Sequence, residues 1–248
     1  TGTSDAITAH SNVAIGHVAM KLATTANSCV VIGRDAGDAL TTGNLNVAVG
    51  YNALTNEVSG ISTVAIGDNA GLAQNLGSAA STYNVMVGSG AGFWNVTGTG
   101  NTYLGAGAGT GASGQSNSSN TGVGYSALTS ITTGGSNVAL GNAALTNLTS
   151  ASYNIGIGSE ALLAATTNYG NVAIGWYAGH TADSSGTTAV DNVYIGKATG
   201  RYMDDAQYNT AVGTGAMVGA STGNTNSHNT AVGYNSLLAI TTGGANVA

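Results

Sequence analysis

The 248-residue sequence has no proline, a single cysteine and very few charged residues. Because proline lacks a backbone N–H, its absence fits a chain whose amides donate to neighbouring strands. One cysteine, Cys29, excludes an internal disulfide framework. Charged residues form 6% of the chain, against about 25% in typical soluble domains. This composition argues against an ordinary globular enzyme.

Basic side chains are especially scarce, with four against ten acidic ones and a net charge of −6. Lys21, Arg34, Lys197 and Arg201 are too few to form a patch that neutralises phosphates, so we expect no nucleic-acid partner. No apolar run approaches the roughly 18 residues of a spanning helix, so we expect no membrane insertion in this segment. The sequence begins at Thr1 without a signal-peptide pattern, and we expect that an upstream segment was removed or left out.

Glycine, by contrast, is abundant, with 40 residues. A chain rich in Gly, Ser, Thr and Asn could be a flexible linker, but disorder requires low hydrophobicity. Here 42% of the residues are apolar, and they are regularly spaced. The sequence therefore predicts an ordered repeat rather than a linker.

A five-residue motif recurs along the whole chain. Counting Asn-Val-Ala-Ile-Gly at 12–16, the motif occurs thirteen times when substitutions are allowed, and successive motif glycines are 17 to 21 residues apart. Repeats of this kind indicate a solenoid in which each copy forms one rung. The motif glycines are Gly16, Gly33, Gly50, Gly67, Gly88, Gly105, Gly124, Gly141, Gly158, Gly175, Gly196, Gly213 and Gly233.

A longer period is superimposed on the rungs. Six successive spacings cover 108 residues and the next six cover 109, and residues 131–139 recur at 240–248 with one change. We therefore predict one solenoid array over 1–248, with six-rung units at about 12–119 and 120–228 and a partial third unit at 229–248. Because solenoid ends need caps and none is evident, we expect that the chain is a segment of a longer fibre or that neighbouring molecules cover its ends.

The motif positions suggest distinct roles. Its second and fourth residues are mostly Val, Ile or Leu and share one face of a strand, which we expect to point into the rung interior. The third residue is small in most copies, and we expect this opposite face to pack against another chain. The leading Asn is expected to form a hydrogen-bonded ladder between rungs, and the glycine to supply a turn that other residues resist.

The motif resembles two known groups of repeats. Asn-Val-Ala-Ile-Gly-x-x-Ala is similar to the head repeats of trimeric autotransporter adhesins, and the segments starting at Asn46 and Asn229 resemble the repeats of phage and other viral tail fibres. The resemblance covers nearly the whole chain. It implies a left-handed parallel β-roll, a homotrimer and a role in surface adhesion or host recognition, and leaves virus and bacterium both open.

We thus predict an all-β parallel β-solenoid with rungs of about 17 residues, serving outside the cell as a structural, adhesive fibre segment of a virion or cell surface. A subunit that polymerises end to end into an extracellular filament is the alternative hypothesis. We predict no enzymatic activity, cofactor or metal. Histidines at four different repeat phases do not converge as metal ligands would; they are His10, His17, His180 and His228.

Two further hypotheses rank lower. A polysaccharide-depolymerising enzyme would need paired carboxylates, for which Asp183 with Asp191, Asp204 with Asp205, or Asp35 with Asp38 are the candidates. These carboxylates are interpreted as solvated turn residues. An ice-binding solenoid would need a regular array of threonines, but Thr occupies the second motif position in only four copies.

Recognition of a cell-surface carbohydrate or protein receptor is expected at aromatic side chains. The residue after the motif glycine varies freely and should be exposed, and exposed aromatic rings often mark contacts. Packing against a neighbouring chain or against a long turn is the alternative role for these rings. Insertions at 72–83 and 180–191 are further candidates for projecting loops. The candidate recognition residues are Tyr51, Phe93, Trp94, Tyr125, Trp176, Tyr177, Tyr202 and Tyr234.

Overall fold

The computed structural model describes residues 8–181, 189–203, 205–220, 224 and 226–248. It divides into two compact units, Thr1–Asn120 (unit 1) and Thr121–Ala248 (unit 2). The described residues contain no helix, and each strand is three residues long and coincides with the second to fourth positions of one motif copy. The β-branched residues at these positions favour extended backbone, and the following glycine ends each strand.

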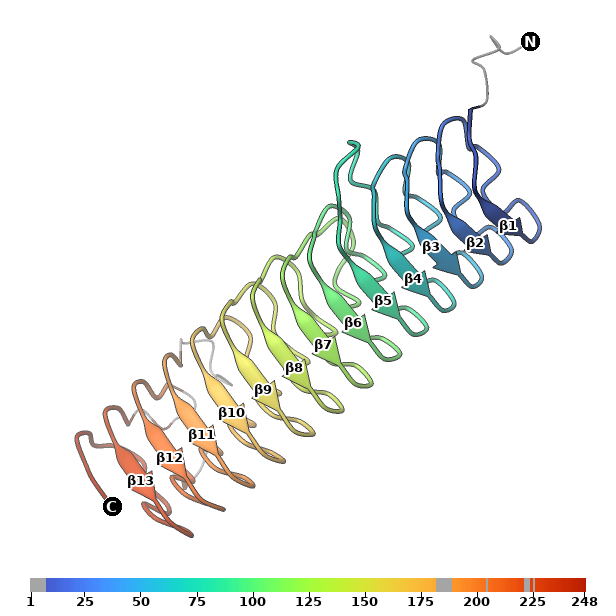
Figure 1. The fold of residues 1–248 in the computed structure, drawn as a ribbon. Helices are drawn as coiled ribbons and strands as arrows, with labels where there is room; N and C mark the ends of the chain where they lie inside the picture. Colours follow the sequence, from blue (N-terminus) through green and yellow to red (C-terminus); the bar gives the residue numbers. More distant parts are fainter. Residues whose placement is uncertain (1–7, 182–188, 204, 221–223, 225) are drawn as a thin grey trace. The chain divides into compact units, whose positions relative to one another are not determined.

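Within each unit, consecutive strands pair in parallel and in the same motif register, as for Val47 with Val64. Figure 1 shows them side by side, each joined to the next by a looping return. In unit 1 they are β1 (Val13–Ile15), β2 (Val30–Ile32), β3 (Val47–Val49), β4 (Val64–Ile66), β5 (Val85–Val87) and β6 (Thr102–Leu104). In unit 2 they are β7 (Thr121–Val123), β8 (Val138–Leu140), β9 (Ile155–Ile157), β10 (Val172–Ile174), β11 (Val193–Ile195), β12 (Thr210–Val212) and β13 (Thr230–Val232).

The predicted fold class is confirmed: the chain is an all-β parallel β-solenoid with rungs about 17 residues apart. The left-handed coil and the trimer implied by the resemblance stay predictions.

The prediction of which strand face lies inside is wrong. Ala48, the third motif residue of β3, is fully buried, whereas Val47 and Val49 on the opposite face are only half-buried. The same pattern holds in β8 and β9. The reason is space: Ala53 and Leu54 of the turn that follows β3 are also fully buried, so only a small strand residue fits beside them. The bulky Val and Ile side chains point outward instead.

In many rungs, the size of the third motif residue is matched to that of the residue six positions later. Rungs with a small third motif residue commonly carry Leu six positions later, as with Ala139 and Leu145, both fully buried. Where the third residue is Tyr194, the residue six positions later is Gly200, and a Cβ there would lie 2.2 Å from the tyrosine ring. Tyr103 and Gly109 form an equivalent pair in unit 1, at 2.3 Å. Burial raises the pKa of both tyrosine hydroxyls.

The predicted asparagine ladder is confirmed and is continuous in unit 2. The side-chain oxygen of each motif Asn accepts the backbone N–H of the next one, as for Asn137 and Asn154 at 2.9 Å, and also its Nδ2 at 3.1 Å. The Asn154 Nδ2 donates further to the carbonyl of Asn168 at 2.7 Å. In unit 1, Cys29 and Thr63 replace Asn, but their N–H groups still donate to the preceding motif Asn at 2.9 Å.

The turn after each strand also forms backbone hydrogen bonds with the neighbouring rungs. Gly50 has φ of +138°, and a Cβ on it would lie 2.3 Å from the carbonyl oxygen of Gly67 in the next rung, so glycine is required. Asn52 and Leu54 follow with positive φ. The N–H of Asn52 donates to the preceding rung (Arg34 O, 3.1 Å), and that of Leu54 to the following rung (Ala70 O, 3.0 Å). A proline at either position would remove such a bond.

Candidate functional site

The outer face of the sheet exposes branched apolar side chains. We call the second and fourth motif residues of all strands the outer sheet face. In unit 1 the exposed fraction of Leu104 is 47%, and in unit 2 those of Ile174 and Ile195 are 36% and 37%. All-parallel sheets occur almost only with both faces covered, and contiguous exposed apolar surface marks interaction sites. This face has the character of an interaction surface that the isolated chain leaves exposed to solvent.

The residues after the motif glycines form a second surface, which we call the turn edge. Sequence analysis expected exposed aromatic side chains there, and Tyr51, Tyr125, Trp176 and Tyr234 are exposed by 45%, 64%, 49% and 79%. The structure thus places these four candidates where a partner could reach them. Their role in recognition stays a prediction.

The other candidate aromatics lie deeper in the same turns. Phe93 and Trp94 are half-buried after β5, with ring centroids 4.5 Å apart in an edge-to-face arrangement. Tyr177 and Tyr202 are half-buried in unit 2. Phe93 and Trp94 therefore form a pair by themselves, whereas Tyr177 and Tyr202 belong to the cluster described below.

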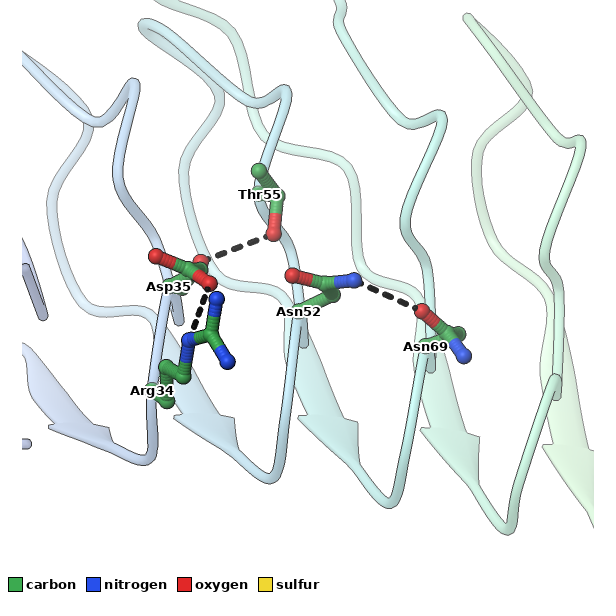
Figure 2. A network of polar contacts seen from close by, with 5 residues as sticks. All are labelled: Arg34, Asp35, Asn52, Thr55 and Asn69. Carbon is green, nitrogen blue, oxygen red and sulfur yellow. Dashed lines mark hydrogen bonds and ion pairs between the residues drawn. The ribbon is translucent and has the colours of Figure 1, made fainter. Parts of the chain in front are cut away.

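In unit 1 the turn edge after β2 to β4 is mainly polar (Figure 2). Asn52 donates to the side-chain oxygen of Asn69 at 3.1 Å, and the Thr55 hydroxyl donates to the carbonyl of Asp35 at 2.8 Å. Arg34 forms an ion pair with the adjacent Asp35 at 3.0 Å and lies 5.5 Å from the ring centroid of Tyr51. The charge of this arginine is thus already paired.

In unit 2 the turn edge after β10 and β11 carries a cluster of rings and cations. Trp176, Tyr177, Lys197 and Arg201 line a surface hollow of about 320 Å³ together with Ala198. Lys197 Nζ lies 4.7 Å from the Trp176 ring centroid. The rings of Trp176 and Tyr177 are 4.8 Å apart.

Arg201 is held between two tyrosines in this hollow. Its guanidinium carbon lies 4.6 Å from the ring centroid of Tyr202 and 5.5 Å from that of Tyr177. Its Nε atom is buried and has no hydrogen-bond partner. Among the residues that the structure describes, neither Lys197 nor Arg201 forms an ion pair. We call Trp176, Tyr177, Lys197, Arg201 and Tyr202 the aromatic–cation cluster.

Glu160 of the preceding rung and His180 of the same rung support the cluster. The Tyr177 hydroxyl donates to Glu160 Oε1 at 3.3 Å, and His180 Nε2 lies 3.1 Å from Glu160 Oε2. The His180 and Tyr177 rings are 4.5 Å apart. Desolvation, and then the negative charge of Glu160, raise the pKa of the Tyr177 hydroxyl.

Sequence reasoning missed several side chains of these surfaces. From the sequence alone, Lys197 and Arg201 count only as scattered bases, and nothing links either of them, Glu160 or His180 to Trp176. Aligning the rungs provides the missing signal, because Trp176 and Lys197 both follow a motif glycine in consecutive rungs. A second missed set precedes the motif Asn: Tyr83, Tyr153 and Tyr208, exposed by 69%, 70% and 50%.

The insertions differ in what they contribute. In 72–83, Gln74 is fully buried and bridges the rungs, donating to Thr63 and accepting from Asn84, each at 3.0 Å. Residues 77–80 of this insertion are exposed. Most of the 180–191 insertion lies outside the described residues.

The carboxylate pairs considered for catalysis are only partly described. Asp183 and Asp204 lie outside the described residues. Asp35 is paired with Arg34, and Asp191 is exposed in a turn. In the part of the chain that the structure covers, no three His, Cys, Asp or Glu side chains come together as metal ligands would. Nor do those residues form a helix long and apolar enough to span a membrane.

No protein-family model, curated protein or solved structure matches the chain.

Proposed function

We propose that the chain is a structural, adhesive fibre segment that acts outside the cell as a rigid attachment element of a virion tail fibre or cell-surface adhesin. Three chains associate through their outer sheet faces, and the turn edges carry the receptor contacts. No enzymatic step is part of this role. The observation that carries the proposal is the outer sheet face, an apolar surface on an all-parallel sheet, which such sheets normally cover.

The rungs themselves give further support. Much of the buried interior consists of Ala side chains, each of which removes little apolar surface from water. Hydrogen bonds between rungs fix the register of the stack, but each contributes only about 0.5–1.5 kcal/mol net to folding stability. Covering the exposed Val, Ile and Leu side chains between chains would add the burial that a single solenoid lacks.

Light scattering on the intact chain tests the association. The expected mass is three times the 24.0 kDa of one chain. A double variant, Ile66→Lys with Ile174→Lys, places one charge on the outer sheet face of each unit, at residues exposed by 37% and 36%. It should be monomeric, because an unpaired charge cannot be buried in an apolar interface.

The matched control carries the same two charges elsewhere. Asn56→Lys with Asn142→Lys places them at exposed turn positions and should leave the trimer intact. A native chain that runs as a monomer contradicts the proposal. Open-ended growth in mass would favour the end-to-end filament instead.

A further inference from the structure

The aromatic–cation cluster gathers positive charge in a chain that has very little. Lys197 and Arg201 are two of only four basic residues, and the net charge is −6. Arg34, in unit 1, already has a carboxylate partner. The two bases of the cluster have no such partner among the described residues. An anion is therefore the ligand charge that this hollow favours.

The arginine is pre-positioned for such an anion. Its guanidinium is planar and offers five N–H donors that match the two oxygens of a carboxylate. Contact with Tyr177 and Tyr202 holds that plane. The Nε is buried and has no protein acceptor, so a ligand carboxylate would be bound by the terminal N–H groups of the guanidinium, which no carboxylate of the described residues pairs.

The remaining walls suit a sugar ring. Half of Trp176 is exposed, and aromatic faces of this kind pack against the apolar face of a ring while polar groups bond at its rim. Lys197 and Tyr177 line the hollow. The Tyr177 hydroxyl donates its hydrogen to Glu160 and can accept a hydrogen bond from a sugar hydroxyl. A hollow of about 320 Å³ lies at the lower end of small-molecule sites, about 300–1,000 Å³, which fits a single ring better than an extended chain.

We propose that the aromatic–cation cluster binds one carboxylated sugar residue, such as a uronic or sialic acid, within a surface polysaccharide. Arg201 and Lys197 contact its carboxylate, and Trp176 packs on its ring. This inference rests on the proposed function, because it names the class of receptor that the fibre would recognise.

The test compares acidic saccharides with their neutral counterparts on the assembled native chain. Digalacturonate and sialyllactose are titrated by calorimetry and tryptophan fluorescence, with the digalacturonate methyl ester and lactose as the neutral probes. A Trp94→Phe background leaves Trp176 as the sole tryptophan. We expect at least one acidic probe to bind and to change the Trp176 emission, its neutral counterpart to bind at least tenfold more weakly, and added salt to weaken binding.

Variants connect binding to the cluster. Arg201→Gln should lower the affinity for the acidic probe at least tenfold. Arg34→Gln, which removes a ring-stacked arginine from unit 1, should leave that affinity unchanged. Equal loss in both variants, equal binding of acidic and neutral probes, or no binding of either acidic probe would overturn the inference. The mass by light scattering is measured on the same samples, so a chain that remains trimeric but binds no acidic sugar refutes this inference alone.

Discussion

At the scale of single residues, the sharpest feature is the buried carboxylate of Glu57. Its side chain is fully buried, and Oε1 accepts the N–H groups of Val58, Ser59 and Gly60 at 2.7–3.1 Å. Oε2 accepts from Gln74 Nε2 and the Leu76 N–H, both at 3.3 Å. The carboxylate thus binds the first turn of the 72–83 insertion to the rung before it.

We predict that Glu57→Gln destabilises unit 1 by about 1–3 kcal/mol, since an amide NH₂ cannot accept where the carboxylate does and leaves buried donors unpaired. Urea unfolding followed by circular dichroism measures the change. Glu160→Gln is the matched control because that side chain is partly exposed, and it should cost less than about 0.5 kcal/mol. Equal losses in the two variants would mean that burial of the carboxylate is not the cause.

At the scale of the rung, the interior obeys a size rule that links two positions six residues apart. Tyr194 occupies the space that Leu fills in other rungs, and Gly200 leaves room for its ring. Ala139 and Leu145 show the opposite arrangement, with Leu145 at a φ of 52°.

Two rungs pair two small residues instead, Ala65 with Gly71 and Ala173 with Gly179. There a large side chain of the following rung, Met86 or Tyr194, lies 3.1 Å from where a Cβ on the glycine would be. Two large residues in one rung do not fit the narrow interior.

We therefore predict strong coupling between these positions. Tyr194→Ala alone should cost about 3–5 kcal/mol through the cavity it leaves. Gly200→Leu alone should cost at least as much, because its Cβ would overlap the ring. The double variant recreates the pairing of Ala139 with Leu145 and should be more stable than either single variant. Thermal unfolding of all four proteins measures the coupling, and additive losses would disprove the size rule.

The same rungs show what sequence could predict. The thirteen strands of the described residues, their parallel stacking within each unit and the asparagine ladder follow from the motif. A repeat that places Asn and Gly at equivalent positions in every rung requires an equivalent backbone in every rung. Which face lies inside could not be read from hydrophobicity. That choice depends on Leu54 and Ala53 filling the interior from the turn, which is a tertiary effect. The clustering of Arg201 with Trp176 depends likewise on how the turns after β10 and β11 lie against each other.

At the scale of the whole molecule, the reversal of the strand faces changes the argument for association. The sequence suggested that a smooth, small-residue face would contact other chains, but those residues are the ones buried in each rung, as Ala48 shows. The face left for a partner is instead branched and apolar, as at Ile174. Because apolar area drives association, this surface supports the proposed trimer on different grounds from those of the small-residue face.

If folding and association are coupled in this way, stability must depend on protein concentration. For a trimer, a hundredfold dilution lowers stability by two-thirds of RT ln 100 per chain, about 1.8 kcal/mol, which corresponds to a fall in Tm of about 4–7 °C for a chain of this size. The Ile66→Lys, Ile174→Lys variant should melt at a lower temperature that is independent of concentration. Differential scanning fluorimetry across that range measures both. A native Tm that does not change on dilution, in a sample whose mass is that of one chain, would mean that the outer sheet face stays open to water and that the rungs are stable without a partner.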